Sequence, residues 1–391
     1  MQQGIFTILP MDRVVYGTPA ATAVAGEAER LGARRVFLIV SETLATTTDE
    51  IDRIRRALSD RVAGVFSGVP PHVPRPSVIE AAARARAAGA DLICTVGGGS
   101  VTDAGKGVQL CLAHDVTEPG QLDALRLQPQ ADGAIVNPLA GTPGPAVRQI
   151  AVPTTLSGGE FNATGGITDL ATNRKHAYSH PRLTPRAVIL DPAITRHTPE
   201  WLFLSTGVRA FDHTVEGLCS KAPTPLTDAT ATQAMRLLMD GLAAAKADPA
   251  DMDARLTALQ GVWISMVAVQ AGVPMGASHA VGRALGGSCG VPHGHTSCVL
   301  MPSVMRWNVD WNGDRQARVA AAMGHPGKAA GDVIEAFIAG LGQPTSLSAV
   351  GVGRDKFDLI ADASMADRGI RDNPRPIEGP GDVRQILELA A

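Results

Sequence analysis

The stretch DLICTVGGGSVTDAGKGV, residues 91–108, decides the fold of this chain. It begins as a short apolar run typical of a buried parallel strand, and a helical pattern starts near Val101. Between the two lie three glycines and a serine, Gly97, Gly98, Gly99 and Ser100. Glycines at such a junction let a pyrophosphate approach the backbone, and the helix N-terminus attracts its negative charge. Plain turns use the same residues, so the sequence predicts either a phosphate-binding loop or a tight turn.

The segments on both sides of this stretch alternate between strand and helix patterns. The predicted strands are 34–40, 62–69 and 149–155, and the predicted helices are 49–58 and 76–89. This βαβ order predicts a doubly wound parallel sheet of the Rossmann type. We therefore expect an α/β domain over residues 1–192, with an exposed Pro- and Gly-rich loop between Glu118 and Arg148.

The second half of the chain carries a different pattern. From Ile194 onward no comparable strand occurs, and Ala-, Leu- and Met-rich segments such as 225–247 and 249–272 have helical periodicity. The change falls near 191–195, where a strand-like run stops at an Asp-Pro pair. We therefore expect an all-helical domain over residues 193–391.

Composition limits the kinds of partner. The chain has 391 residues, 45% hydrophobic content and a formal net charge of −3. Without long Lys/Arg runs, nucleic acid and anionic membrane surfaces are poor partners, and a small-molecule substrate is favoured. No membrane-spanning run or signal-peptide pattern is present, so a cytoplasmic location is expected. The five cysteines form no CxxC pair, which indicates reduced thiols rather than disulfides or a zinc ribbon.

A second loop resembles the first in its position. The strand at 149–155 runs into LSGGE, so the hydroxyls of Thr154, Thr155 and Ser157 lie at the carboxyl end of a strand, where open α/β sheets bind ligands. In the helix after the first loop, Asp103 and Lys106 have two interpretations. They are either a dipole-favoured aspartate and a solvated lysine, or contacts to a bound cofactor.

The helical half contains a candidate cluster of histidines and arginines. In GVRAFDHTVEG, residues 207–217, helical periodicity puts Arg209, His213 and Glu216 near one face. In GASHAVGRALGGSCGVPHGHT, residues 276–296, His279 and Arg283 are four residues apart, and His293 follows a glycine-rich break. We expect His213, His279 and His293 to converge.

Taken together, these motifs resemble the iron-containing alcohol dehydrogenase superfamily. The segments GGGSVTDAGK, PTT, LDPAIT, AFDHTVEG, HAVGRALGG with PHG, and NPRPI (373–377) occur in the same order as in that superfamily, over nearly the whole chain. The stretch GVFSGVPPHVP (64–74) is closest to its maleylacetate reductase branch. The resemblance implies the group III alcohol dehydrogenase, or dehydroquinate synthase-like, architecture. It also implies a dinucleotide-binding domain, a helical substrate domain, a cleft between them and a homodimer.

The resemblance also implies a set of cofactor contacts. Gly97, Gly98, Gly99 and Ser100 match the pyrophosphate loop, Asp103 matches a loop aspartate, and Thr154 and Thr155 match nicotinamide-side threonines, with Ser157 beside them. Lys175 matches a lysine near the cofactor. Ser41, next to Glu42, stands where many relatives have an aspartate that binds the ribose 2′-OH and excludes NADP. Both NADH and NADPH are therefore possible cofactors.

Two residues depart from the metal-binding pattern of the superfamily. There, iron or zinc is held by an aspartate and three histidines, and His213, His279 and His293 occupy the histidine positions here. Arg209 stands in the aspartate position, and Arg283 replaces a further histidine near the reacting carbon. A guanidinium repels a divalent cation and, with a pKa above about 12, does not become a ligand, so a bound metal is disfavoured. Asp212 lies roughly 100° around the helix from His213 and is a poor substitute.

The resulting hypothesis is a reductase that works with arginines in place of a metal. Arg209 or Arg283 would orient a substrate carboxylate, and His279, His293 or His213 would donate the proton. Alternatively, Arg209 forms a structural bridge with Asp212 or Glu216. The leading function is NADH- or NADPH-dependent reduction of 2-maleylacetate to 3-oxoadipate, a step of aromatic compound catabolism.

Three other functions remain possible from the sequence. One is a metal-dependent alcohol or aldehyde dehydrogenase of the same superfamily that acts on a neutral substrate. Another is a relative of sugar-phosphate cyclases or glycerol-phosphate dehydrogenases, although few extra Lys or Arg residues surround the histidines to hold a phosphate. The last is a non-catalytic protein that keeps the cofactor fold.

Overall fold

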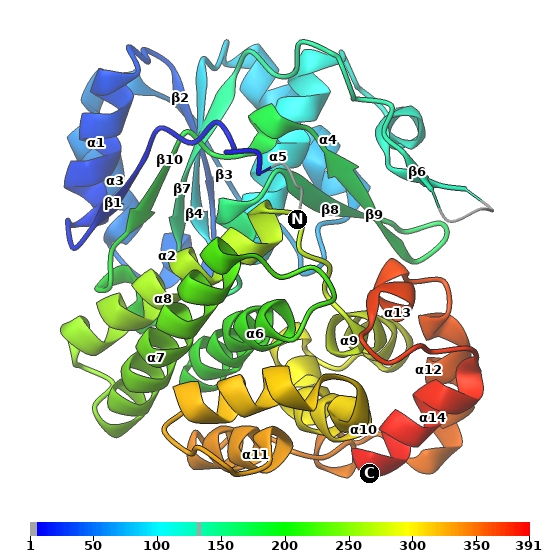
Figure 1. Cartoon of the computed structure of the whole chain (residues 1–391). Coiled ribbons are helices and arrows are strands. Elements are labelled where there is room, and N and C mark those ends of the chain that lie inside the picture. Colours follow the sequence, from blue (N-terminus) through cyan, green and yellow to red (C-terminus); the bar gives the residue numbers. More distant parts are fainter. Residues whose placement is uncertain (1–5, 131–133) are drawn as a thin grey trace. The chain divides into compact units, whose positions relative to one another are not determined.

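The structure, a computed structural model, describes residues 6–130 and 134–391, which form two compact units (Figure 1). We call Ile8–Thr198 the sheet unit and Pro199–Ala391, with Phe6 and Thr7, the helical unit. The predicted fold class is confirmed, because a parallel six-stranded sheet with helices is followed by an all-helical part. The assignment of cofactor binding to residues 1–192 and substrate binding to 193–391 stays a prediction.

The sheet unit is built on six parallel strands in the order β1-β10-β7-β4-β2-β3. Their bounds are Arg13–Tyr16 (β1), Val36–Val40 (β2), Val62–Ser67 (β3), Leu92–Gly97 (β4), Arg148–Pro153 (β7) and Ala187–Leu190 (β10). From β2 the chain first adds β3 on one side and then crosses to add β4 on the other. The direction of strand addition thus reverses between β2 and β4, and the crevice beyond the carboxyl ends of such a strand pair is where open α/β sheets bind ligands.

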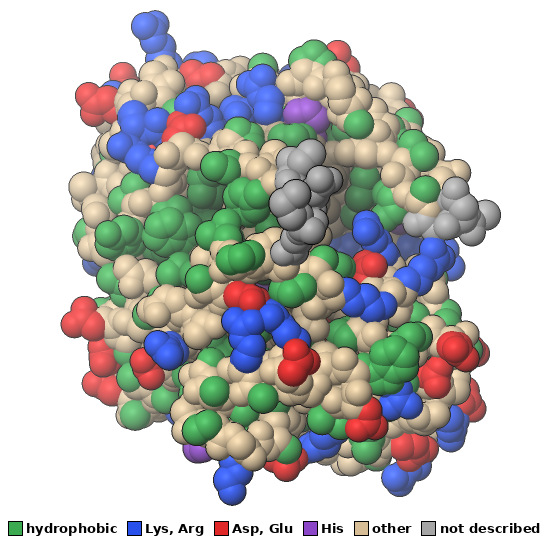
Figure 2. Space-filling model, viewed as in Figure 1, with side chains coloured by type: hydrophobic (Ala, Val, Ile, Leu, Met, Phe, Trp, Pro, Cys, Tyr) green, Lys and Arg blue, Asp and Glu red, His purple; other side chains and the backbone are tan. Residues whose placement is uncertain are grey.

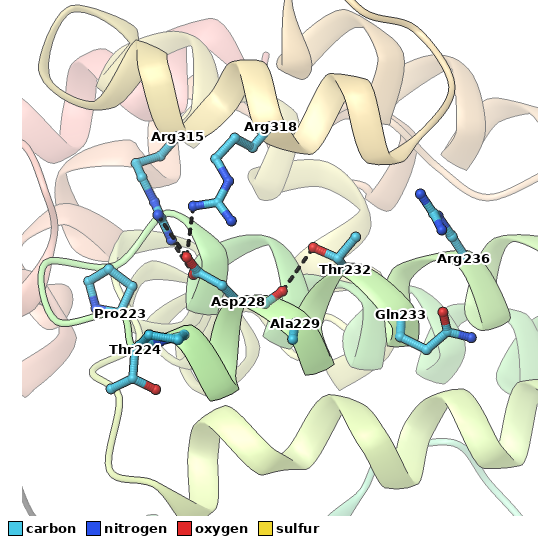
Figure 3. A pocket seen from close by; sticks show the side chains of 10 residues that line it. Pro223, Thr224, Asp228, Ala229, Thr232, Gln233, Arg236, Arg315 and Arg318 are labelled. Carbon is cyan, nitrogen blue, oxygen red and sulfur yellow. Dashed lines mark hydrogen bonds and ion pairs between the residues drawn. The ribbon is translucent and has the colours of Figure 1, made fainter.

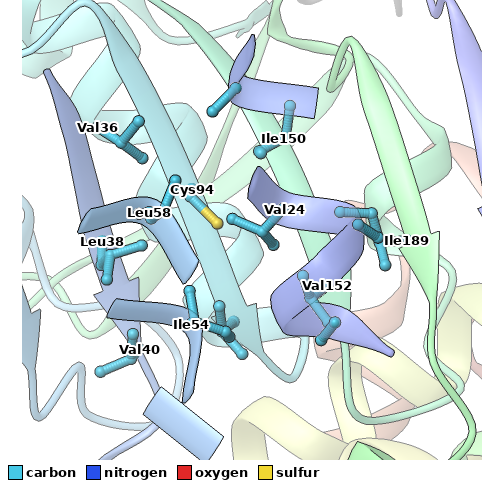
Figure 4. Close-up of a cluster of buried hydrophobic side chains, with 14 of the residues drawn as sticks. Val24, Val36, Leu38, Val40, Ile54, Leu58, Cys94, Ile150, Val152 and Ile189 are labelled. Carbon is cyan, nitrogen blue, oxygen red and sulfur yellow. The ribbon is translucent and has the colours of Figure 1, made fainter. Parts of the chain in front are cut away.

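Helices cover both faces of this sheet, as the alternation of strand and helix predicts. One face packs against α1 (Ala20–Arg30) and α3 (Glu50–Leu58), and the other against α4 (Arg75–Ala87) and α5 (Gly99–Ala113). Figure 4 shows the first of these cores, in which Val36, Leu38 and Val40 of β2 meet Val24, Ile54 and Leu58 of the helices. Phe37 and Ile39 point to the other core. Burial on both faces explains why β2 is apolar throughout.

An antiparallel hairpin that the sequence analysis did not predict adds to the sheet unit. It pairs β8 (Thr164–Asp169) with β9 (Arg174–Ser179). Its strands are rich in glycine and charged residues and lack a clean apolar alternation, so periodicity gave little signal. Within the segment predicted as an exposed loop, the structure describes a 3-10 helix, Pro119–Leu125, and the short strands Gln128–Pro129 (β5) and Ile135–Val136 (β6). The short helix α2 (Glu42–Thr47) follows β2.

The helical unit is organised around α6 (Glu200–Leu218), which is buried at every residue from Phe203 onward. The other helices are α7 (Pro225–Ala247), α8 (Met252–Gln270), α9 (Ala277–Cys289), α10 (His293–Ala322), α11 (Ala330–Gly340), α12 (Phe357–Ser364), α13 (Arg368–Asp372) and α14 (Pro380–Leu389). Because α6 is enclosed on all sides, its polar residues must find partners inside the protein. This requirement creates the candidate site described below.

The surface carries charges of both signs, and the cysteines are free thiols. Acidic and basic side chains are interspersed over the helices of the helical unit on the face that Figure 2 shows. In the described parts of the chain, no helix is both long enough and apolar enough to cross a membrane. All five cysteines are free thiols, and four of them, Cys94, Cys111, Cys219 and Cys298, are buried.

A close contact between α7 and α8 yields a test of this packing. A Cβ atom added to Gly241 would lie 2.5 Å from the backbone nitrogen of Ala258. We therefore expect Gly241→Ala to lower the free energy of unfolding of the helical unit by about 1–3 kcal/mol, because overpacking forces the helices apart. Denaturation followed by tryptophan fluorescence measures this directly, since all four tryptophans lie in the helical unit.

The matched control is Gly340→Ala at the end of α11, where an added Cβ meets nothing within 4 Å. This variant should be as stable as the parent or slightly more stable, because alanine favours the helix. Equal stability of the two variants would contradict the close packing of α7 on α8.

Candidate functional site

In the sheet unit, the residues predicted to bind the cofactor lie where strand addition reverses. Gly98 stands between β4 and α5, and the carbonyl of Gly97 accepts a hydrogen bond of 3.1 Å from the Thr154 amide at the end of β7. The amide of Ser41, which follows β2, donates to the Val96 carbonyl at 2.8 Å. The ends of β2, β4 and β7 thus carry the predicted residues to one edge of the sheet.

The two loops fit closely against each other at Gly98 and Gly99. A Cβ atom on Gly98 would lie 3.0 Å from Cγ2 of Thr155, and one on Gly99 would lie 3.0 Å from Oγ of Ser157. The Ser157 hydroxyl is buried and has no hydrogen-bond partner among the described residues. An anionic ligand such as a pyrophosphate would accept a hydrogen bond from this hydroxyl. It would also be favoured by the nearby glycine backbone and the helix N-terminus.

Asp103 and Lys175, two further predicted cofactor contacts, lie together. Oδ2 of Asp103 on α5 accepts hydrogen bonds of 3.2 Å from the amide of Gly166 on β8 and from Nζ of Lys175 on β9. The hairpin that the sequence did not predict therefore brings Lys175 to the helix that follows the glycine loop. The roles of both residues toward a cofactor stay predictions.

Lys106 corrects one expectation, because it is not a solvated lysine. Its ammonium is buried and donates to the carbonyls of Gly159 and Thr164, at 2.7 and 2.8 Å, and to Oδ1 of Asn162 at 2.9 Å. Burial lowers the pKa of Lys106 to about 8 and raises the pKa of the neighbouring, buried Glu160 to about 7. Lys106 thus ties the loop after β7 to α5.

Glu160 provides a test through the pH dependence of stability. Because its folded-state pKa is raised from 4.5 to about 7, its contribution to stability is complete below pH 4.5 and is lost as the pH rises through 7. The loss amounts to about 3 kcal/mol over this range. We expect Glu160→Gln to remove this part of the decline.

Hydrogen exchange of the β4 and β7 amides measures this effect, since the sheet unit has no tryptophan. Glu80→Gln, at an exposed carboxylate on α4, is the control and should keep the decline of the parent protein. A Glu160→Gln protein with the same pH profile as the parent would show that Glu160 is not buried as the structure has it.

In the helical unit, a second cluster joins α6 and α9. Arg209, Asp212, His213 and Glu216 project from α6, and His279 from the first turns of α9, and all five are buried. The imidazole rings of His213 and His279 lie 4.8 Å apart, centroid to centroid. Two of the three histidines that were expected to converge are thus in contact.

Arg209 lies inside this cluster with Asp212 as its nearest acidic group. Its Nη1 donates to the Ser297 hydroxyl at 2.8 Å and lies 3.7 Å from Oδ2 of Asp212. The hydroxyls of Ser297 and Ser278 both donate to that same oxygen at 2.7 Å. Burial lowers the pKa of Arg209 to about 10, below the expected 12, which still leaves it charged at neutral pH. Burial, aided by Glu216, raises the pKa of Asp212 to about 7.

Glu216 contacts His279 and the beginning of α9. Its Oε2 lies 2.7 Å from Nδ1 of His279 and accepts a hydrogen bond of 3.0 Å from the Gly276 amide, while Oε1 accepts one of 2.8 Å from the Ser278 amide. Burial lowers the pKa of both His213 and His279 well below the ordinary value, so both imidazoles are neutral at pH 7. Nδ1 of His213 and Nε2 of His279 are buried without a hydrogen-bond partner among the described residues.

The remaining predicted site residues lie toward the surface of the unit. The side chain of Arg283 is 47% exposed and donates from Nε and Nη2 to the two carboxylate oxygens of Asp367, at 2.6 Å each. His293 is the first residue of α10 and is exposed. Its ring nitrogens are not among the possible metal-ligating atoms of this unit that lie within 4.8 Å of one another.

The arrangement does not fit the divalent metal of the superfamily. In this unit, the described residues whose ligand atoms lie within 4.8 Å of one another are Asp212, Glu216 and His279, not the three histidines. Oδ2 of Asp212 and both oxygens of Glu216 are engaged with hydroxyl and amide donors, while Oδ1 of Asp212 is buried without a hydrogen-bond partner among the described residues. The guanidinium of Arg209 supplies a positive charge in the same cluster, so an added divalent cation would be repelled.

An open groove of about 750 Å³ lies elsewhere in the helical unit, along α7 and the second half of α10 (Figure 3). It is lined by Pro223, Thr224, Pro225, Asp228, Ala229, Thr232, Gln233, Arg236, Arg315 and Arg318. Arg315 and Arg318 both bind the Asp228 carboxylate, with Nη1 distances of 3.0 and 2.7 Å. None of these residues belongs to the buried cluster, and we assign the groove no catalytic role.

Comparison with known proteins identifies the family. The profile described as iron-containing alcohol dehydrogenase matches residues 11–192, and the C-terminal profile of the same family matches residues 203–391. The chain belongs to the iron-containing alcohol dehydrogenase family, close to its maleylacetate reductases. This confirms the predicted class, an oxidoreductase that uses NADH or NADPH.

Individual relatives agree on the family and differ in activity. Maleylacetate reductase of Rhizobium sp. strain MTP-10005 is 31% identical over 100% of this chain and 98% of its own. Its crystal structure matches with a TM-score of 0.83, at 30% identity, over 100% of this chain and 98% of that one. The dehydrogenase FUM7 of Gibberella moniliformis is 32% identical over 97% of this chain and 96% of its own. The 4-hydroxybutyrate dehydrogenase of Cupriavidus necator is 30% identical, with coverages of 94% and 95%.

The sequence analysis missed the polar residues that complete the cluster. Ser278, Ser297 and Asp367 each bind one of the predicted site residues or its partner, and none was proposed for the site. Asp212 was predicted as one of two alternative partners of Arg209, and the 3.7 Å pair agrees with that alternative. The spacing along α6 did predict one further member of the cluster, because it placed Glu216 on the same face as Arg209 and His213. The serines carry no such signal, since serine is common at buried and exposed positions alike.

Proposed function

We propose that this oxidoreductase reduces the carbonyl group of an oxo acid, with maleylacetate as the leading substrate and NADH or NADPH as the electron donor. The buried pair of neutral imidazoles beside the fixed charge of Arg209 carries this proposal. It is supported by the maleylacetate reductase relatives at about 30% identity. The name 4-hydroxybutyrate dehydrogenase also denotes a substrate with a carboxylate, which favours an acidic substrate class over one particular acid.

The sheet unit would hold the dinucleotide. Gly98 and Gly99 leave room for a pyrophosphate against the backbone, and the unpartnered Ser157 hydroxyl would donate to it. Thr154 and Thr155 stand at the end of the neighbouring strand. Ser41, with no charge to repel a 2′-phosphate, leaves NADPH acceptable beside NADH. When bound, the reduced nicotinamide supplies the hydride.

The buried cluster of the helical unit would handle the charge that forms on the substrate oxygen. Hydride addition to a carbonyl produces an alkoxide, which must be stabilised and protonated. The nitrogens of His279 and His213 that lack partners are the groups positioned to exchange this proton. The buried guanidinium of Arg209 adds a permanent positive charge and donates from Nη1 to the Ser297 hydroxyl.

Arg283 is the better candidate to bind a substrate carboxylate. Nε and Nη2 are bound to Asp367, while Nη1 takes no part in that pair, and the side chain is about half exposed. A guanidinium held rigidly by a carboxylate keeps its remaining N–H groups in a fixed direction, which suits carboxylate recognition. We further propose that the protein forms a homodimer in the cytoplasm and acts in the catabolism of aromatic compounds.

The reaction and its metal dependence are tested in one experiment. We expect oxidation of NADH or NADPH with maleylacetate to be faster than with neutral aldehydes. We also expect it to survive exhaustive chelation, because the buried cluster contains Arg209 and does not fit a divalent metal. The metal content of the same sample should be far below one ion per chain. Activity only on neutral aldehydes, lost on chelation and restored by iron or zinc, would instead favour the metal-dependent alcohol dehydrogenase.

The role of Arg283 is tested by Arg283→Met. Loss of a charged hydrogen bond to a carboxylate costs about 1.5–3 kcal/mol, so kcat/KM for maleylacetate should fall by about 10- to 100-fold. The value for a neutral aldehyde should change little. Arg368→Ala removes a 68% exposed arginine of α13 and serves as the control. Equal losses on charged and neutral substrates would contradict a carboxylate-binding role.

A further inference from the structure

The groove along α7 and the second half of α10 carries an inference that goes beyond the proposed reaction. We propose that this groove binds an elongated anion of the linear polyphosphate class, such as the phosphate chain of a nucleotide. Its volume of about 750 Å³ is within the range of small-molecule sites. The groove lies entirely within the helical unit, and its lining residues belong neither to the buried cluster nor to the predicted cofactor loops.

One end of the groove contains an ion pair that is fixed in place. Arg315 donates from Nη1 to Oδ2 of Asp228 at 3.0 Å, from Nη2 to Oδ1 of the same carboxylate, and from Nε to the Leu218 carbonyl at 2.7 Å. The side chains of Arg315 and Asp228 are only 17% and 16% exposed. Because all three nitrogens of this guanidinium are engaged, Arg315 contributes a positive charge at a fixed position.

The groove keeps an excess of positive charge after this pairing. Arg318 binds the same carboxylate, with Nη1 2.7 Å from Oδ2 of Asp228. Burial alone would raise the pKa of Asp228, but the hydrogen bonds from Arg315 and Arg318 lower it, so the carboxylate is ionised at neutral pH. Asp228 is the one acidic residue among the described residues that line the groove, and three of them are arginines. Three positive charges against one negative charge attract an anion with more than one charge.

Two of the arginines retain N–H groups for a ligand. Arg318 binds Asp228 through Nη1, which leaves its Nε and Nη2, and its side chain is 49% exposed. Arg236 is exposed and has no hydrogen-bond or ion-pair partner in the described parts of the chain (Figure 3). The N–H groups of a guanidinium match the oxygens of a phosphate group in pairs, so both side chains suit phosphate recognition.

The spacing of these two arginines selects the shape of the anion. Asp228 and Arg236 are eight residues apart on α7, which is about 12 Å along the helix axis. Figure 3 shows Arg318 beside Asp228, Arg236 at the far end, and Thr232 and Gln233 between them. A compact anion contacts one of the two arginines. A linear polyphosphate has negative charge along its whole length and reaches both.

A competing explanation makes the groove an ordinary solvated surface that holds a structural ion pair. Arg315 and Asp228 fit this explanation, because they join α10 to α7 and to Leu218 at the end of α6. Arg236 does not fit it, since it supports no contact within the described parts of the chain. The two explanations therefore differ in what the loss of Arg236 does. It abolishes tight anion binding at unchanged stability, or it changes neither.

The test is titration calorimetry of the full chain with sodium tripolyphosphate, at constant ionic strength and without divalent cations. We expect inorganic phosphate to bind at least about tenfold more weakly, because it contacts one of the two arginines. Arg236→Met and Arg318→Met should each raise the Kd for tripolyphosphate by about 10- to 100-fold. The control is Arg384→Met, which removes the same charge from α14, at a side chain that is 41% exposed. It should keep the Kd within about twofold.

The outcomes that would overturn the inference are distinct from a failure of the proposed reaction. Because the glycine loop of the sheet unit could also hold tripolyphosphate, the titration is repeated with saturating NADH, and binding in the groove should persist. Binding that is unchanged in both arginine variants would overturn the inference, as would equal Kd values for phosphate and tripolyphosphate or no binding at all. Calorimetry needs no turnover, so these results hold whichever substrate the enzyme reduces.

Discussion

The carboxylate of Glu216 is the contact on which the interior of the helical unit depends. It belongs to α6, the most enclosed helix, and it binds the first amides of α9 together with the imidazole of His279. Without it, the beginning of α9 would have buried N–H groups without partners, and a buried imidazole would lose its orientation. One carboxylate thus couples the packing of two helices to the geometry of the candidate site.

The buried charges in this cluster stabilise one another. A buried guanidinium is costly unless it has acidic and hydrogen-bonding partners, and Arg209 has Asp212, Ser297 and, farther along the same helix, Glu216. Asp212 in turn takes hydroxyl donors from α9 and α10. The arginine is therefore not an isolated change at a metal position. Arg209 is part of a hydrogen-bonded network with Asp212, Ser278 and Ser297, and its guanidinium supplies the positive charge of that network.

The sequence predicted the sheet unit better than the interior of the helical unit. The alternation of apolar and helical segments located β2, β3, β4 and β7, and the two glycine- and hydroxyl-bearing loops do meet at one sheet edge. The β8–β9 hairpin was not predicted because strands rich in glycine and charge lack period-two alternation. Of the two interpretations of Lys106, the solvated lysine was wrong, because its position on α5 does not reveal the carbonyls of Gly159 and Thr164 that surround its ammonium. For the histidines, helical spacing brought His213 and His279 together correctly. Spacing within one helix does not specify which residues of another helix face it, so Ser297 was missed as a partner of Arg209, whereas Asp212, on the same helix, was predicted as one of its two alternative partners.

The distribution of the cysteines has a practical consequence for spectroscopy. Burial raises the pKa of Cys94, Cys111 and Cys219 to about 12, so these thiols are both inaccessible and un-ionised at neutral pH. Cys298 is buried as well, and Cys289 is the one cysteine with a partly exposed side chain. Since Cys289 ends α9, the helix that carries His279 and Arg283, a thiol-reactive fluorophore or spin label would attach there without any engineered cysteine. The native chain thus carries a built-in attachment point for a reporter on that helix.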